Sequence, residues 1–245
     1  MKLAPKDSVL TTLWLLDHGV SHKLAWWYVK SGWFERIAEG AYCFSGAKIS
    51  WASAIVAIQQ QCRLPIYPGG KTALQLLGKS HFINMELKSI QLFADRKSRI
   101  PTWLKAPFWE GAFDIFRPKL FTSDDVSWLA TLDVGGHQLL VSTPEKASIE
   151  LCYLVPNKVT FSEASLILEG LPRMRSKIIQ SLLESCRSYK AKRLLLYLAE
   201  HYQHPWYSEL NLKRIDLGAG KYVIAGGRKY INKYKISIPI LEEDK

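Results

Sequence analysis

The sequence predicts a mixed α/β (α+β) protein in which an N-terminal winged helix-turn-helix precedes a larger domain of helices and sheets. Two short helix patterns and a hairpin pattern open the chain, and helix and strand patterns are mixed along the rest. The composition, 48% hydrophobic and 22% charged, is typical of a folded globular protein. No apolar run approaches the roughly 18 to 20 residues that a membrane helix needs. The first residues lack the apolar core of a signal peptide, so we expect a cytoplasmic protein.

The N-terminal module is predicted at about residues 6–48 from its caps and turns. Ser8 and Ser21 each precede a helical pattern, and a serine hydroxyl can accept a bond from the free N–H groups of a first turn. Gly19 is expected to end the first helix. Glu39-Gly40 is expected to form a two-residue hairpin turn, since glycine tolerates positive φ. The predicted elements are helices at residues 9–18 and 22–31 and strands at residues 34–38 and 41–44.

The second helix of this module has two different faces, which suggests that it reads DNA. At about 100° per residue, the packing face takes Leu24, Trp27, Tyr28 and Ser31. The opposite face, which also carries Val29, is basic, polar and aromatic, as in a helix that enters a DNA groove. The candidate DNA-binding residues are Ser21, His22, Lys23, Trp26 and Lys30 on this helix, with Arg36 and Lys48 near the ends of the hairpin. The alternatives are a merely solvated charged face and a small protein-binding unit.

The rest of the chain mixes helix and strand patterns. Helices are predicted at residues 50–61, 71–77, 162–169, 175–186 and 190–202, and one more opens at Thr143-Pro144. Strands are predicted at residues 89–93, 113–116, 130–134, 138–142, 222–225 and 234–238, with Gly135-Gly136 and Gly226-Gly227 as turns. A polar stretch at residues 94–99, followed by Pro101, suggests a boundary near residue 95. The predicted domains are therefore a DNA-binding domain at residues 1–95 and a mixed α/β domain at residues 96–245.

The formal net charge is +11, and most of it lies in the C-terminal part. Residues 1–48 carry six Lys/Arg and four Asp/Glu, residues 49–150 carry eleven and nine, and residues 151–245 carry sixteen and nine. A polyanion should therefore contact the C-terminal part too, because Lys and Arg neutralise phosphates. The candidate polyanion-binding residues are Arg173, Arg175, Lys190, Lys192, Arg193, Arg228 and Lys229. The alternatives are an acidic protein partner and cations that only solvate a helix start.

No catalytic, cofactor or metal site is predicted, and we expect a protein that is not an enzyme. Gly70-Lys71-Thr72 resembles the end of a P-loop, but the position of the first glycine of that loop is Pro65. Residues 218–223 begin like a dinucleotide fingerprint, yet the last glycine position is Val223. Glu243 and Lys245 have a nuclease-like spacing in a terminal tripeptide, which is poor ground for catalysis. The scattered cysteines are expected to be reduced and mostly buried: Cys43, Cys62, Cys152 and Cys186.

Four segments in order carry a resemblance to a known family. They are residues 19–42, which include Lys30-Ser31-Gly32-Trp33-Phe34-Glu35-Arg36, and residues 68–74, 142–147 and 215–224. Together they resemble the AbiE-type antitoxins, the first component of bacterial abortive-infection (type IV) toxin–antitoxin systems of phage defence. The resemblance spans nearly the whole chain.

This resemblance implies a two-domain transcription regulator and antitoxin. Its N-terminal domain would bind inverted repeats in its own promoter and repress the operon. Its C-terminal domain would counteract a nucleotidyltransferase toxin without a stable complex, and tRNA is a candidate polyanion for the basic C-terminal surface. Two other hypotheses compete with it: a nucleic-acid-processing enzyme with a nuclease-like C-terminal domain, and a basic protein-binding scaffold. The sequence shows none of the clustered carboxylates that metal-assisted cleavage needs.

Overall fold

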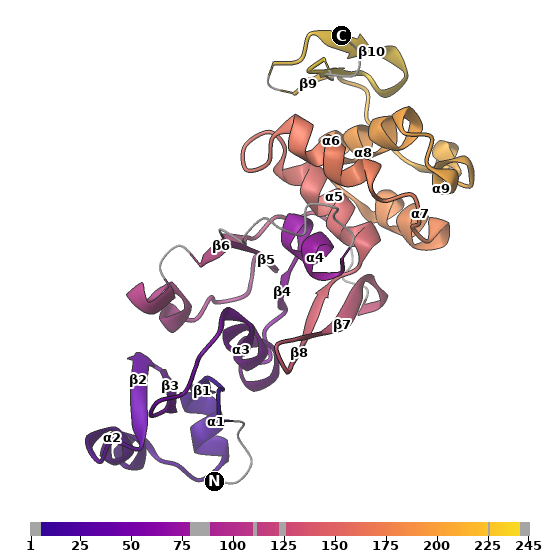
Figure 1. The fold of residues 1–245 in the computed structure, drawn as a ribbon. Helices are drawn as coiled ribbons and strands as arrows, with labels where there is room; N and C mark the ends of the chain where they lie inside the picture. The colour runs from indigo at the N-terminus through magenta and orange to yellow at the C-terminus, as the bar shows by residue number, and fades with distance from the viewer. Residues whose placement is uncertain (1–5, 79–88, 110–111, 123–125, 225, 241–245) are drawn as a thin grey trace. The chain divides into compact units, whose positions relative to one another are not determined.

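The computed structural model describes residues 6–78, 89–109, 112–122, 126–224 and 226–240 (Figure 1). The described residues form two compact units. One is drawn from residues 1–67, 87–118 and 131–140, and the other from residues 68–86, 119–130 and 141–245. Each unit therefore uses chain from both sides of residue 95. The division into residues 1–95 and 96–245 stays a prediction.

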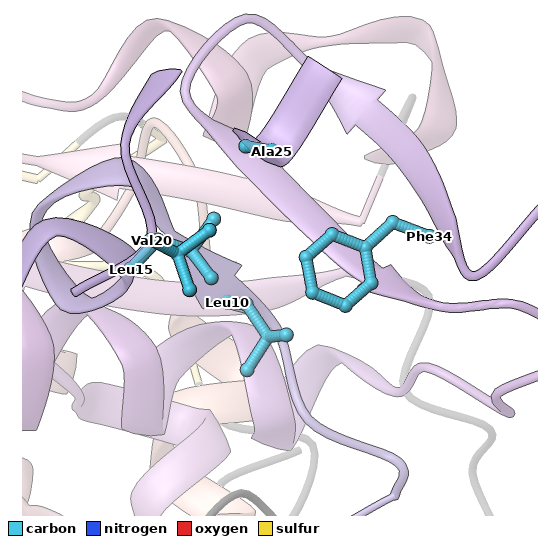
Figure 2. Close-up of a cluster of buried hydrophobic side chains, with 5 residues drawn as sticks. All are labelled: Leu10, Leu15, Val20, Ala25 and Phe34. Carbon is cyan, nitrogen blue, oxygen red and sulfur yellow. The ribbon is translucent and has the colours of Figure 1, made fainter. Parts of the chain in front are cut away.

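The first unit begins with a winged helix-turn-helix, as predicted. Its elements are β1 Leu10–Thr11, α1 Thr12–Asp17, α2 His22–Lys30, β2 Phe34–Ala38 and β3 Ala41–Phe44. The strands form an antiparallel sheet in the order β1-β3-β2. Figure 2 shows the core of this module, to which the two helices, the turn between them and the sheet contribute the buried side chains Leu10, Leu15, Val20, Ala25 and Phe34.

Local capping explains why the second helix and the hairpin match the prediction. The Ser21 hydroxyl accepts a bond from the backbone N–H of Leu24 at 3.2 Å and so caps the start of α2. Gly19 has a φ of +77°, which lets the chain turn sharply between α1 and α2. Gly40 has a φ of +86° in the turn between β2 and β3. The helix-turn-helix and its hairpin are therefore encoded by local sequence signals.

The first helix begins later than predicted, at Thr12, and Ser8 does not cap it. Leu10 and Thr11 instead extend along β3, with Leu10 opposite Tyr42. The side-chain amide of Gln61 fixes this extension, because it accepts a bond from the Thr11 N–H at 2.8 Å and donates one to the Val9 carbonyl at 2.7 Å. The Thr11 hydroxyl then caps the helix. A contact 50 residues away in the chain thus overrides the local helix pattern.

The remaining elements that lie mainly in the first unit follow the predicted order, with one additional strand and two additional 3-10 turns. They are α3 Trp51–Val56, a π-helical turn Ala57–Gln61, β4 Ile66–Pro68, β5 Ile90–Ala94, the 3-10 turns Thr102–Lys105 and Pro107–Trp109, β6 Phe113–Phe116, and the pair β7 Leu129–Val134 and β8 His137–Ser142. Strand β4 was not predicted, since its residues lie in a stretch rich in proline and glycine. It joins β5 and β6 in one sheet, in the order β4-β5-β6, and β5 and β6 are parallel.

The second unit is built around α5 Pro144–Leu154, which packs against four other helices (Figure 1). These neighbours are α4 Gly70–Leu76, α6 Phe161–Glu169, α7 Ser176–Ser185 and α8 Tyr189–His201, and a short helix α9 Pro205–Ser208 follows. Helix α5 begins after Thr143 with Pro144 in its first turn, as predicted. It is buried along most of its length, including the polar side chains Glu145, Lys146 and Glu150.

A small C-terminal sheet completes the second unit. It contains β9 Tyr222–Val223, β10 Lys229–Ile231 and β11 Ile236–Ile238 in the order β10-β11-β9. Two of these strands lie within the predicted strand segments, of which residue 225 lies outside the described residues. The third, β10, was not predicted, because a strand of only three residues between two turns is too short to show an alternating pattern. Among the helices of the described ranges, none combines the length and apolar character that crossing a bilayer requires.

Glu150 gives the second unit a pH-dependent element. Its carboxylate accepts bonds from the Gly70 N–H at 3.0 Å and the Ser142 hydroxyl at 2.8 Å, and so links α4 and β8 to α5. Burial raises the pKa of Glu150 to about 7, although the nearby Lys146 ammonium opposes the rise. The folded protein therefore holds a proton that the unfolded chain releases near its ordinary pKa of 4.5.

We expect the free energy of unfolding to fall as the pH rises through the interval between these two values. The loss attributable to Glu150 is about 2–3 kcal/mol between about pH 5 and pH 8. Urea unfolding of the wild type and of Glu150→Gln at both pH values measures it, because the variant cannot ionise. Relative to the variant, the free energy of unfolding of the wild type should be lower by this amount at the higher pH than at the lower pH. A difference between the two proteins that does not change with pH would contradict the assignment.

Candidate nucleic-acid interface

Helix α2 presents five side chains to solvent on one face. Four of them are the predicted DNA-binding residues His22, Lys23, Trp26 and Lys30. The fifth is Trp27, which was predicted on the packing face. The opposite side of α2 packs through Ala25, which is buried in the module's core. Burial of that side fixes the orientation of the helix, so the exposed face is available to a partner.

The structure corrects the position of Trp27, which was predicted to pack on the first helix. Its side chain is 54% exposed, close to the 60% of Trp26. The small side chain of Ala25 lies closest to the core, and Val29, predicted on the outer face, packs against the core as well. This orientation turns Trp27 toward solvent. The sequence signal that could have placed Trp27 correctly was the pair Ala25 and Val29, a small and a β-branched residue that fit the inner side of the helix.

The exposed face of α2 is basic and aromatic, without an acidic residue on the helix. The Lys30 ammonium lies 5.5 Å from the centre of the Trp26 ring, a cation–π distance. Another tryptophan, Trp33, is 66% exposed just after the helix. Exposed indoles are costly to leave in water, and a cluster of them beside lysines is typical of a surface that a partner covers.

The other predicted DNA-binding residues lie around this helix in different roles. The Ser21 hydroxyl accepts the Leu24 N–H and therefore serves the helix start. Arg36 lies on β2 opposite Tyr42, with an exposed side chain. Lys48 is exposed as well, and its backbone N–H donates to the Asp7 carboxylate at 2.8 Å. The described structure therefore brings four predicted residues together on α2 and leaves Arg36 and Lys48 as neighbouring exposed cations in the same module.

One acidic residue of the hairpin is tied to its own loop. The Glu35 carboxylate accepts bonds from the Ser45 hydroxyl at 2.8 Å and the Gly46 N–H at 2.9 Å. These two bonds, that from Gly46 first, hold the pKa of Glu35 below its usual value. The carboxylate thus orders the end of the hairpin.

The tip of the β2–β3 hairpin packs within the first unit, which disfavours it as a DNA-contacting wing tip. The Gly40 carbonyl accepts a bond from the Thr12 N–H at 3.0 Å. A side chain added at Gly40 would meet the Thr12 hydroxyl and the Trp103 ring, each at 3.8 Å. A substitution at Gly40 therefore tests the packing of this unit and not contact with DNA.

The cations at the start of α8 were predicted to form an exposed basic surface, and this prediction is wrong because they are buried or half-buried. Lys192 and Arg193 are each 2% exposed, and Lys190 is half-buried. The Lys190 ammonium donates to the Tyr153 carbonyl at 2.6 Å and to the Val155 carbonyl, and so satisfies the carbonyl end of α5. These cations do not merely solvate a helix start either. Lys190 and Arg193 bind the backbone of neighbouring segments, and the Lys192 ammonium lies 5.0 Å from the centre of the Tyr189 ring.

Arg193 holds the C-terminal segment to α8. Its guanidinium donates to the carbonyl oxygens of Leu217, Gly218, Gly220 and Lys235, at 2.7, 3.0, 2.6 and 3.0 Å respectively. The glycine-rich stretch that resembles the start of a dinucleotide fingerprint thus turns its carbonyls toward Arg193. A phosphate would need N–H groups at this place, so the loop has a structural role.

The other predicted polyanion-binding residues are exposed. Arg175 forms a bidentate pair with the buried Glu145, at 2.9 and 3.0 Å, and this pairing holds the pKa of Glu145 below its usual value against the opposing effect of burial. Arg173, Arg228 and Lys229 are exposed, the last two beside and on β10. Among the described residues, no group of three His, Cys, Asp or Glu side chains is placed to hold a metal ion.

Comparison with known proteins identifies the family. A family model described as "Transcriptional regulator, AbiEi antitoxin N-terminal domain" matches residues 1–85, and one described as "Transcriptional regulator, AbiEi antitoxin, Type IV TA system" matches residues 87–239. No curated protein matches the sequence. The fold is similar to the crystal structure of RV2827C protein from Mycobacterium tuberculosis, with a TM-score of 0.66 and 15% identity over 94% of this chain and 85% of that chain. The chain belongs to the family of AbiEi antitoxins, the transcriptional regulators of type IV toxin–antitoxin systems.

Proposed function

We propose that this antitoxin represses its own operon by placing α2 in the major groove of inverted repeats in its promoter. The observation that carries the proposal is the exposed face of α2, which combines two lysines, a histidine and two tryptophans without an acidic group. Helices of this kind read DNA with side chains near their first turns, and flanking cations contact phosphates. Arg36 and Lys48 supply such cations in this module.

The same proposal covers the toxin and the cell compartment. The match to a type IV antitoxin model supports a toxin as the functional partner. We propose that this toxin is a nucleotidyltransferase, which the protein counteracts in the cytoplasm without a stable complex. The match also supports a regulator in place of an enzyme. We place the DNA-binding part in the N-terminal domain and the antitoxin part in the C-terminal domain, with a basic surface for tRNA in the latter. That surface excludes the buried cations Lys190, Lys192 and Arg193.

The test of DNA binding is a salt series with the protein's own promoter. Changing Lys23 and Lys30 together to Ala removes two cations from α2, and we expect weaker binding at each salt concentration. The slope of log affinity against log salt should fall by about 2, because each phosphate contact releases counterions. Fluorescence anisotropy with a labelled promoter duplex measures both quantities.

The matched control is Lys97→Ala with Lys105→Ala, which removes two exposed cations of the same unit from outside the helix-turn-helix. It should leave the slope at the wild-type value. A Lys23→Ala, Lys30→Ala protein with normal circular dichroism and a wild-type slope would exclude α2 from the interface.

A further inference from the structure

We propose that the outer face of the C-terminal sheet binds single-stranded RNA. This outer face is defined as the row Tyr230, Ser237 and Val223, together with Lys221, which immediately precedes β9 and lies over the Tyr230 ring. The face lies in the second unit, so it is independent of the promoter-binding surface on α2.

The strand register builds this face. Tyr230 on β10 and Val223 on β9 are both paired with Ser237 on the central strand β11, so the three side chains lie in a row across the sheet. Their neighbours on β11, Ile236 and Ile238, are fully buried on the other side. The row is exposed at both ends, with Tyr230 42% and Val223 62% accessible. A small residue between two exposed ones leaves a flat surface beside an aromatic ring.

Cations surround the ring. The Lys221 ammonium lies 5.2 Å from the centre of the Tyr230 ring, and the exposed Arg228 lies two residues before Tyr230. Residues 211–240 carry seven Lys/Arg and one Asp, a net of +6 out of +11 for the whole chain. Glu184 and Glu200, which lie outside this segment, pair with Arg214 and Lys233 and leave an excess of +4. Such a field attracts a polyanion.

Hydrogen bonds and a close turn anchor the sheet to the helices, which a preorganised binding surface requires. Arg193 binds the segment before β9 and the Lys235 carbonyl before β11. The Tyr234 hydroxyl bonds with the Tyr207 hydroxyl at 2.6 Å and donates to the Glu200 carboxylate at 2.9 Å. At Gly227, an added side chain would lie 2.6 Å from the Ser237 carbonyl, so the turn beside Arg228 can approach β11 only with glycine. This contact places Arg228 beside the outer face and Tyr230 within it.

The chemistry of the face favours unpaired bases. An exposed tyrosine can stack with a base only when that base is free of its partner, and cations along the face can follow the backbone. The face is formed by three short strands, so it presents no helix that could enter the groove of a duplex. Unpaired bases are presented mainly by RNA loops and ends, and the Ser237 hydroxyl, central in the row, can both donate to and accept from a 2′-hydroxyl. Single-stranded RNA therefore fits the face better than duplex DNA.

The test is binding of the full-length protein to a labelled single-stranded RNA of mixed sequence and about 15 nucleotides, a length within the range for such surfaces. Tyr230→Ala should raise the Kd about 5- to 100-fold, as expected for one lost stacking interaction. Tyr230→Phe should bind like the wild type, because the ring is kept. Arg228→Ala should reduce the salt slope by about 1. Lys177→Ala, an exposed cation on α7, is the matched control and should change neither quantity.

Three outcomes would overturn the proposal. The first is wild-type RNA affinity in Tyr230→Ala. The second is equal or tighter binding of the double-stranded RNA or of the single-stranded DNA of the same sequence. The third is no RNA binding together with binding of polyglutamate, which would assign the face to an acidic protein. Promoter affinity should be unchanged in Tyr230→Ala, so failure of this proposal and failure of the promoter proposal are distinguishable.

Discussion

Replacement of Arg193 by Met is expected to lower the free energy of unfolding by about 2–4 kcal/mol. Its guanidinium makes four bonds to backbone carbonyls of the C-terminal segment, and the side chain is almost fully buried. Methionine fills a similar space but donates nothing, which leaves several carbonyls without this donor in a buried setting. Arg193→Lys should also destabilise the protein, since a single ammonium cannot bind carbonyls spread around a planar fork. Urea unfolding measures both effects.

Lys213→Met is the control for the Arg193 prediction, because Lys213 is an exposed cation of the segment that Arg193 holds. It should change stability by no more than about 0.5 kcal/mol. An Arg193→Met protein as stable as this control would contradict the structural role of the guanidinium. The same logic applies to charge reversal of Lys190, Lys192 and Arg193: a loss of antitoxin activity in such a variant would report on folding and not on RNA contact.

Elements with a complete local signal could be predicted from the sequence. Helix α2 has a serine cap at its start, the β2–β3 hairpin has glycine at its turn, and α5 has proline in its first turn. These signals act through residues adjacent in the chain, so no tertiary information is needed. The start of α1 could not be found in this way, because the side chain of Gln61 takes the backbone groups of residues 9 and 11.

The candidate sites show the same division. Helical periodicity correctly predicted most of the outer residues of α2. It did not predict that Trp27 is exposed, because the close packing of Ala25 sets the rotation of the helix. Clustered charge led to the prediction that Lys192 and Arg193 form an exposed basic surface at a helix start. Both are buried. Backbone carbonyls from distant turns surround the guanidinium of Arg193, and the burial of Lys192 lowers the pKa of its ammonium. Charge patterning along a chain does not show which segments will cover a cation.

The second large effect is expected at Trp26 and Trp27. Changing both to Ala should raise the Kd for the promoter about 10- to 100-fold, because large aromatic side chains covered by a partner contribute strongly to binding. Neither substitution removes a charge, so the slope of log affinity against log salt should stay at the wild-type value. This pattern differs from that of the lysine variant, which should lower the slope. Phe108→Ala, an exposed aromatic of the same unit outside the helix-turn-helix, is the matched control.

The central claim is that the exposed face of α2 contacts the promoter, and the Trp26→Ala, Trp27→Ala protein tests it most directly. The measurement is its affinity for the promoter duplex by fluorescence anisotropy across a salt series, beside the wild type and Phe108→Ala. We predict a loss of at least about 10-fold at every salt concentration, with an unchanged slope and wild-type affinity in the control. A folded double variant that binds the promoter as tightly as the wild type would contradict the claim.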